Sequence, residues 1–274
     1  MDLSTIQNAL IGLPIGPIRY YDRTGSTNDE ATKWANHGAE DMSLVIAGEQ
    51  TRGKGRYGRK WSTIPGASLA FSMVLTRFES ISGYRPFDVA HPEMISRMTA
   101  LGAMAVCQAL KSKYKLISQI KWPNDVLLNG QKAAGILAEI HWQADFPIAV
   151  ILGIGVNVGP ESVPAPNELA FPATCIESNL GQPINRLDLL RSIIEQILEW
   201  RKRLEQPEFL RTWEELLAYK GEWVNITIES DSQNEEKRQG LVLGLDNLGG
   251  LRMRDRTGQE FILRMGEIRL RPVE

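Results

Sequence analysis

Residues 119–142, QIKWPNDVLLNGQKAAGILAEIHW, carry the pattern that decides the fold. Two short apolar runs flank a proline turn at Pro123, and a third run follows the pair Asn129 and Gly130. Asn-Gly is the dipeptide preferred in the type I′ turn of a β-hairpin. The segment therefore predicts three consecutive strands, joined first by a proline turn and then by a tight hairpin.

Apolar patterns on both sides of this stretch predict more strands and several helices. Buried strands are expected at Ser43–Gln50, Ser68–Leu75 and residues 148–158. Helices are expected at residues 95–110, 187–204 and 209–219. A further short helix is expected to begin at residues 26–28, because Thr27 and Glu30 have capping-box spacing. These elements predict an α+β fold, with a mixed, largely antiparallel sheet flanked by helices.

The pattern changes near residues 220–222. From Glu222 onward, short alternating strands are separated by polar or Gly-rich turns at residues 231–233, 246–250 and 256–258. We therefore predict a domain comprising residues 1–220 and a small C-terminal β-barrel comprising residues 221–274.

Composition restricts the class of protein. The 274 residues are 43% hydrophobic and carry a net charge of −2, which gives no global field that would attract a polyanion. The two cysteines, Cys107 and Cys175, have no second Cys or His at ligand spacing and are expected to be free thiols. We find no membrane-length apolar run and no signal peptide, so a soluble cytoplasmic protein is expected.

A basic loop at residues 53–61, GKGRYGRKW, alternates glycines with cations. Glycine permits close backbone approach to a ligand, the cations can neutralise anionic oxygens, and Trp61 offers a face for a ring. The loop leads to a strand, whereas Walker and Rossmann loops lead directly into a helix. An ordinary solvated hairpin loop explains the composition equally well.

Two further motifs contain residues suited to ligand binding. Residues 121–125, KWPND, combine a cation, an aromatic ring, a rigid turn and two polar side chains, and Lys132 follows just past the hairpin turn. A β-turn that caps its own backbone would explain this motif if it stood alone. Gly153 and Gly155 interrupt an apolar strand, which indicates close contact with a ligand or simply close packing.

In their order along the chain, these segments resemble the biotin protein ligases. The resemblance rests on STN at residues 26–28, GKGRYGRKW, KWPND with Lys132, GIL at residues 135–137 and GIGVN at residues 153–157. It implies a catalytic domain of the class II aminoacyl-tRNA-synthetase and biotin-ligase type with a small SH3-like barrel behind it. The chain looks like the monofunctional class, which lacks a DNA-binding domain.

The resemblance also implies two sets of binding residues. Biotin would be bound by Ser26, Thr27, Asn28, Gln50, Gly53, Lys54, Gly55, Arg56, Lys132, Gly153 and Gly155. ATP would be bound by Arg56, Arg59, Trp61, Lys121, Asn124, Lys132 and Asn157. The family commonly has Arg where this chain has Lys54, and a lysine cannot form a bidentate fork on an anion.

The implied reaction joins two anions, so fixed positive charge lowers its barrier. Biotin would attack the α-phosphate of ATP, with Arg56 and Lys132 as catalytic cations, and the biotinyl-adenylate would then acylate a lysine of a biotin carboxyl carrier protein. Asp125 is the candidate acceptor of that lysine's proton, and a turn residue is the alternative. Mg²⁺ would accompany ATP, and no residue is predicted as a metal ligand.

Two other functions remain as alternatives. Lipoate ligases and octanoyl transferases share the fold and the carrier chemistry, but the transferases use a cysteine nucleophile, and neither cysteine here lies in a site motif. A nucleic-acid-binding module is the other class, and the net charge of −2 counts against it. We therefore expect no nucleic-acid or membrane partner, and a monomer or weak homodimer.

Overall fold

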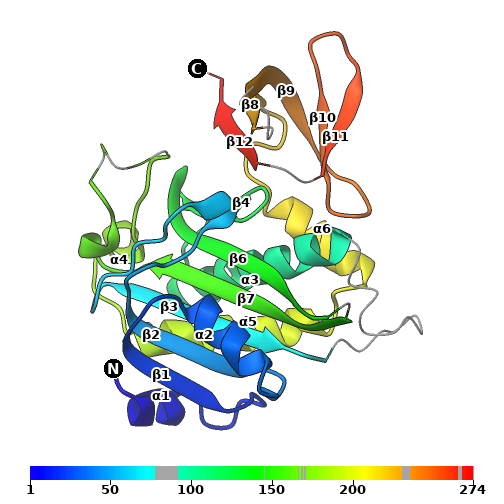
Figure 1. Ribbon diagram of the computed structural model, residues 1–274. Coiled ribbons are helices and arrows are strands. Elements are labelled where there is room, and N and C mark those ends of the chain that lie inside the picture. Colours follow the sequence, from blue (N-terminus) through cyan, green and yellow to red (C-terminus); the bar gives the residue numbers. More distant parts are fainter. Residues whose placement is uncertain are drawn as a thin grey trace.

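Two β-sheets organise the chain, as the ribbon in Figure 1 shows. The computed structural model describes residues 1–77, 92–144, 146–165, 167, 169, 171–229, 235–264 and 267–273. The strands of the large sheet are β1 (Ile18–Thr24), β2 (Ser43–Gln50), β3 (Ser68–Leu75), β4 (Ser118–Lys121), β5 (Asp125–Leu128), β6 (Gln131–Gln143) and β7 (Phe146–Asn157). Their order is β1-β2-β3-β7-β6-β5-β4. Only β1 and β2 pair in parallel among these described strands, which confirms the predicted largely antiparallel sheet.

Helices cover both faces of the large sheet. The α-helices are α1 (Leu3–Ala9), α2 (Thr27–Ala35), α3 (Pro92–Tyr114), α4 (Ile176–Leu180), α5 (Arg186–Arg201) and α6 (Pro207–Glu215). Helices α3 and α5 pack against each other on one face, and α2 lies on the opposite face against β2, β3 and β7. No helix in the described part of the chain combines the length and the hydropathy needed to cross a bilayer.

Alternation along the strands decides which side chains meet α2. Successive residues of a strand point to opposite faces. Phe71 and Leu152 therefore join the large core under α3, whereas Val74 and Ile151 pack with Trp34 of α2. The same alternation puts polar or small residues of β3 and β7 on the α2 face, and the cavity described below lies there.

The stretch that decides the fold forms the predicted elements. β4 and β5 flank the turn at residues 122–124, and β5 and β6 are joined by a hairpin at Asn129 and Gly130. Both turn residues have positive φ, 48° and 74°, as a type I′ turn requires. The predicted helices and buried strands also form, with ends that differ from the expected ones by a few residues.

The predicted capping box at the start of α2 is wrong. Ser26, not Thr27, is the N-cap residue, and its side chain makes no capping hydrogen bond. The hydroxyl of Thr27 instead lies 2.7 Å from Oγ of Ser72 on β3. The Thr27 side chain therefore belongs to a tertiary hydrogen-bond network and does not cap the helix.

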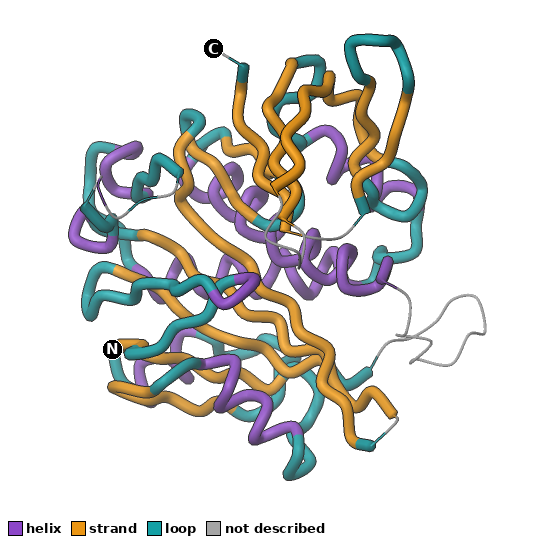
Figure 2. The backbone as a smooth tube through the Cα atoms, turned by 45° about the horizontal axis from the view of Figure 1, so that its top comes forward, coloured by secondary structure: helices purple, strands orange, loops and turns teal. Residues whose placement is uncertain are grey.

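The second sheet contains the last five strands. They are β8 (Trp223–Glu229), β9 (Glu235–Leu245), β10 (Leu251–Arg254), β11 (Glu260–Leu263) and β12 (Glu267–Pro272), in the order β11-β10-β9-β8-β12. All their pairings are antiparallel, and the described strands β11 and β12 do not pair with each other, so the SH3-like barrel is open. Turns form near residues 246–250 and 255–258, and the predicted turn at residues 231–233 lies outside the described residues. Figure 2 shows this sheet standing beside the end of the large one.

Candidate functional site

A cavity of about 770 Å³ lies on the α2 side of β6 and β7. This volume is in the range of small-molecule sites. Its lining includes every predicted site residue: Ser26, Thr27, Asn28, Gln50, Gly53, Lys54, Gly55, Arg56, Arg59, Trp61, Lys121, Asn124, Asp125, Lys132, Gly153, Gly155 and Asn157. The fold thus brings together residues from five separate segments, and the binding role of each remains a prediction.

One end of the cavity is neutral and polar. Thr27 and Asn28, in the first turn of α2, are each only 4% exposed and hydrogen-bond with the buried Ser72. The backbone N–H of Thr27 donates to Oε1 of Gln50 at 2.7 Å. Gln50 Nε2 in turn donates to the hydroxyl of Thr63 at 2.9 Å. These groups are hydrogen-bonded to one another before any ligand is considered, so this end is preorganised.

The glycines of β6 and β7 make room for side chains of the site. A Cβ on Gly153 would lie 2.1 Å from Oδ1 of Asn28, and a Cβ on Gly155 would lie 2.4 Å from the ring of Trp61. Gly135, the cross-strand partner of Gly155, also lies under the Trp61 ring, where a Cβ would approach it to 2.9 Å. The glycines therefore form a flat floor on which Asn28 and Trp61 rest.

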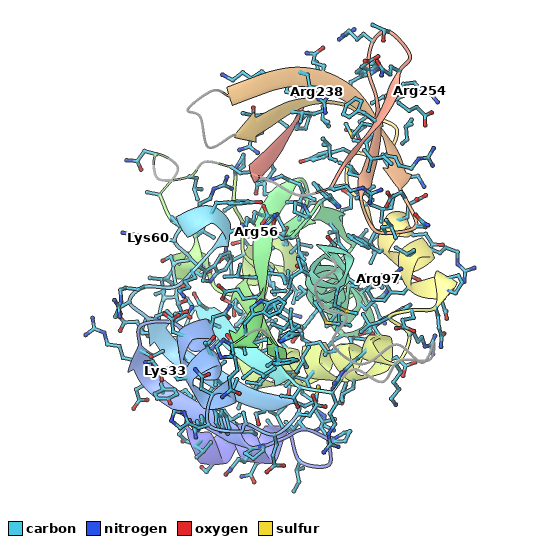
Figure 3. All side chains as sticks on the ribbon, turned by 45° about the vertical axis from the view of Figure 1, so that its right-hand side comes forward. Lys33, Arg56, Lys60, Arg97, Arg238 and Arg254 are labelled. Carbon is cyan, nitrogen blue, oxygen red and sulfur yellow. The ribbon has the colours of Figure 1, made fainter. Side chains whose placement is uncertain are left out.

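The basic loop folds as a small hairpin over the cavity. Gly55 N–H donates to the carbonyl of Arg59 at 2.7 Å, and Trp61 N–H donates to that of Gly53 at 2.8 Å. A short 3-10 turn, η1 (Arg56–Gly58), forms the tip. Figure 3 shows Arg56 lying over the middle of the molecule and Lys60 projecting outward, and Lys60 is exposed.

Lys54 lines the cavity and also pairs with an acidic residue of α2. Its ammonium group pairs with the carboxylate of Asp29 in the first turn of α2. The hydrogen bond to Asp29 raises the pKa of Lys54. Both side chains are well exposed, at 44% and 39%, so solvent screens the pair. Lys54 borders the cavity, but its charge is shared with the start of α2.

The other end of the cavity is cationic and is organised around Asp125. Nζ of Lys132 lies 2.6 Å from Oδ1 of Asp125, and Nζ of Lys121 lies 3.3 Å from Oδ2. Burial alone would raise the pKa of Asp125, but the two lysines outweigh burial and lower it. Burial also lowers the pKa of Lys121, and Asp125 offsets only part of this effect. One carboxylate thus faces two lysines, and positive charge remains for an anionic ligand.

Asparagines connect the cationic end to the backbone. Asn124 Nδ2 donates to the carbonyl of Ile136 at 3.2 Å, while its Oδ1 lies 3.5 Å from Nη1 of Arg56. Asn157 Nδ2 donates to the carbonyl of Thr174 at 3.1 Å. Both amides fix local backbone geometry next to the predicted nucleotide site.

The sequence analysis did not identify Phe171, Arg271 or Glu139 as residues of this region. Phe171 and Arg271 line the cavity, and the Phe171 ring lies 4.0 Å from Nζ of Lys121 and 4.6 Å from Cζ of Arg271. Arg271 belongs to β12, so no local pattern could have placed it here. Glu139 of β6 accepts a hydrogen bond from Asn28 Nδ2 at 2.6 Å. An acidic residue inside an apolar strand is the one signal that could have revealed it.

Cysteine and histidine take no part in the described cavity. Burial raises the pKa of Cys107 to about 12, so its thiol is not a ready nucleophile. His37 and His141 contact Lys33 and Asn36 near the end of α2, and His91 lies outside the described residues. No group of three or more His, Cys, Asp or Glu side chains forms a metal cage within the described residues.

Comparisons with known proteins identify relatives of this chain. The model of the biotin/lipoate A/B protein ligase family matches residues 20–157. The biotin–[acetyl-CoA-carboxylase] ligase of Paracoccus denitrificans is 31% identical over 88% of this chain and 95% of that protein. The bifunctional ligase/repressor BirA of Bacillus subtilis is 35% identical over 64% of this chain. The chain spans about half the length of that protein.

A solved structure agrees over nearly the whole chain. Biotin protein ligase from Aquifex aeolicus, in complex with biotin and ATP, matches with a TM-score of 0.75 and 26% identity. The match covers 94% of this chain and 99% of that one. Family model, relatives and structure therefore lead to one conclusion: the chain belongs to the biotin/lipoate A/B protein ligase family.

Proposed function

We propose that this protein is a biotin protein ligase. It activates biotin with ATP to biotinyl-5′-AMP and pyrophosphate, and then transfers biotin to a lysine of a biotin carboxyl carrier protein. The observation that carries the proposal is the division of one cavity into a neutral, hydrogen-bonding end and a cationic end. Biotin has the matching division, with a ureido ring at one end and a carboxylate at the other.

The strands set the distance between the two ends. Along β6, the carbonyl oxygen of Leu137 lies 3.4 Å from Nδ2 of Asn28. Gly135 lies under the ring of Trp61, and Nζ of Lys132 lies 2.6 Å from Oδ1 of Asp125. An extended strand rises about 3.3 Å per residue, so Leu137 and Lys132 are separated by about 16 Å. The Lys132 side chain turns back toward Gly135 and so shortens the distance between the two ends. We place biotin along this strand, with its carboxylate directed toward Arg56 and Lys132.

Fixed cations explain how the first step is accelerated. The carboxylate of biotin attacks the α-phosphate, a bond forms between oxygen and phosphorus, and pyrophosphate leaves. Arg56 and Lys132 hold both anions at attacking distance and stabilise the charge that develops on the phosphate. Lys121 adds positive charge from a buried position, and Trp61 offers a ring face to the nucleotide.

Mg²⁺ is expected to enter with ATP. Triphosphate oxygens and water can fill most of its coordination shell, so a dedicated set of protein ligands is unnecessary. Asp125, the buried carboxylate nearest the cations, already faces two lysines. We therefore propose no protein ligand for the ion, whose contribution is to neutralise the triphosphate.

The second step needs an acceptor for the proton of the carrier lysine, and Asp125 remains our candidate. Its lowered pKa keeps it ionised at neutral pH but makes it a weak base. Five other expectations remain predictions: the carrier protein, the two-domain division at residue 220, the cytoplasmic location, the lack of a nucleic-acid partner, and the monomer or weak homodimer.

Pyrophosphate exchange tests the proposal directly. Incubation with labelled pyrophosphate, ATP and biotin should return label to ATP, and substitution of lipoate for biotin should abolish the exchange. The neutral end supports this preference, because buried hydroxyls and amides match a ureido ring and would lose hydrogen bonds to an apolar dithiolane. Exchange with lipoate but not with biotin would reject the proposal.

A further inference from the structure

A chain of short hydrogen bonds runs from Glu139 to the neutral end of the cavity. Asn28 Nδ2 donates to Oε2 of Glu139 at 2.6 Å and lies 3.4 Å from the carbonyl oxygen of Leu137. Asn28 Oδ1 lies 2.6 Å from Oγ of Ser72. Oγ of Ser72 lies 2.7 Å from Oγ1 of Thr27. Asn28, Ser72 and Thr27 are at most 4% exposed, so water cannot replace these partners.

The carboxylate of Glu139 decides which group donates and which accepts in each of these hydrogen bonds. An ionised carboxylate can only accept hydrogen bonds, so the amide of Asn28 must turn its NH₂ group toward Glu139. Oδ1 of Asn28 then faces Ser72 and can only accept, which uses the one hydroxyl proton of Ser72. The oxygen of Ser72 is consequently an acceptor toward Thr27. Thr27 must therefore direct its own hydroxyl proton to Ser72.

Gln50 supports the same direction from the other side. The backbone N–H of Thr27 is a fixed donor and lies 2.7 Å from Oε1 of Gln50, which fixes the orientation of the Gln50 amide. The contact from Thr27 Oγ1 to this oxygen is longer, at 3.1 Å, than the contact to Ser72. With its proton directed to Ser72, the hydroxyl oxygen of Thr27 keeps lone pairs for a donor in the cavity.

We propose that Glu139 is a positioning residue that makes the Thr27 hydroxyl an acceptor for an N–H group of the substrate. This inference rests on the proposed function and deepens it, because the ureido ring of biotin presents N–H donors. Glu139 acts through Asn28 and Ser72, and it selects a ligand whose buried end donates hydrogen bonds. A fatty acyl or lipoyl end has no such donor.

The variant Glu139→Gln tests the direction of hydrogen-bond donation, because it hardly changes the shape of the side chain. A glutamine amide can donate to Oδ1 of Asn28, which lets both amides turn over and reverses the protons of Ser72 and Thr27. The dissociation constant for biotin should rise about tenfold, as expected for one misdirected buried hydrogen bond. The KM for ATP and kcat at saturating biotin should change less than about twofold, because the cationic end is untouched.

A double variant provides the rescue. Asn28→Asp combined with Glu139→Gln exchanges the carboxylate and the amide. Asp at position 28 can only accept, so Ser72 must again donate to position 28 and Thr27 must again donate to Ser72. Biotin affinity should recover most of the loss seen in Glu139→Gln, whereas Asn28→Asp alone places two carboxylates together and should bind biotin weakly.

Controls separate this role from simple stability. Glu195→Gln makes the same chemical change at a carboxylate on α5 that pairs with Arg191, and it should leave biotin affinity unchanged. Wild-type protein is titrated with biotin first, since absence of binding there would reject the proposed function itself. Given wild-type binding, unchanged affinity in folded Glu139→Gln overturns the inference. A loss of kcat without a change in biotin affinity, or no recovery in the double variant, also overturns it.

Discussion

The neutral and cationic ends of the cavity differ in how they are built. At the neutral end, the backbone N–H of Thr27 donates to Gln50, and the side chains of Thr27 and Asn28 hydrogen-bond with Ser72. At the cationic end, Asp125 faces two lysines, so positive charge exceeds negative charge in this cluster. The comparison indicates a division of labour. Under the proposed function, preorganised hydrogen bonds would select the substrate, and excess positive charge would lower the barrier of the reaction.

The strongest test of this division is Lys132→Ala. Its ammonium group lies beside Asp125 and reaches the place where carboxylate and α-phosphate would meet. Biotin-dependent pyrophosphate exchange should fall about 10²- to 10³-fold, as for the loss of a transition-state donor. Biotin affinity should change far less. Lys113→Ala, which removes a surface partner of Asp188, is the matched control, and near-normal exchange in folded Lys132→Ala would contradict the catalytic role.

Arg56→Gly tests whether the basic loop retains the adenylate. A guanidinium can bridge carboxylate and phosphate oxygens, so its removal should speed release of biotinyl-adenylate by about ten- to a hundredfold. Biotin entry should be affected less, because the neutral end is intact. Blotting an unrelated lysine-rich protein for biotin measures the leak, with Arg254→Gly on β10 as control. Labelling confined to the true carrier would show that retention does not depend on Arg56.

Asp125→Asn probes the balance of charge at the cationic end. Loss of the carboxylate leaves Lys121, which is 9% exposed, without its ion-pair partner and should cost about 3 kcal/mol of stability at pH 7. The pKa of Asp125 is lowered by folding, so its stabilisation is present above the unfolded pKa and disappears as the pH falls.

Thermal unfolding at several pH values checks this sign. The difference in melting temperature between wild type and Asp125→Asn should be full near pH 7 and should shrink as the pH falls below about 4. Asp188→Asn removes an exposed carboxylate and should show little difference at any pH. A difference in melting temperature that grows as the pH falls would mean that the ionised Asp125 carboxylate does not stabilise the two lysines.

The smallest effect is expected from the pair between Lys54 and Asp29. Both partners are well exposed, so a double-mutant cycle with Lys54→Ala and Asp29→Ala should give a coupling energy below about 1 kcal/mol. Biotin affinity, measured by calorimetry, should change less than about twofold in Asp29→Ala, because Asp29 is not among the residues predicted to bind biotin. A coupling of several kcal/mol would mean that this contact holds the loop closed and that the neutral end extends to it.

Much of the fold was predictable because local patterns decide it. The Asn129–Gly130 turn and the apolar runs beside it predicted three strands that the structure contains. The candidate residues were also predictable as a group, since their motifs meet in one cavity. The capping box at Thr27 was not, because a tertiary bond to Ser72 competes with local capping. The ion pair between Lys54 and Asp29 was not predictable either, since its two partners lie on different elements.

Long-range contributions explain the remaining gaps. Arg271 lies on the last strand and reaches the cavity only through the packing of the second sheet, so no spacing in the sequence could indicate it. Glu139 lies in the part of β6 whose apolar residues predict a buried strand. The direction of its hydrogen bond emerges once Asn28 and Ser72 are placed in space.

The indole of Trp122 has a consequence for shortening the chain. Its Nε1 donates to the carbonyl of Gly249, in the turn between β9 and β10, at 3.0 Å, and the side chain is 2% exposed. This hydrogen bond thus links the segment that contains Lys121 and Asn124 to the second sheet. A fragment ending at residue 220 would uncover an aromatic surface and a buried donor, and we expect it to lose nucleotide affinity and aggregate rather than persist as a smaller enzyme.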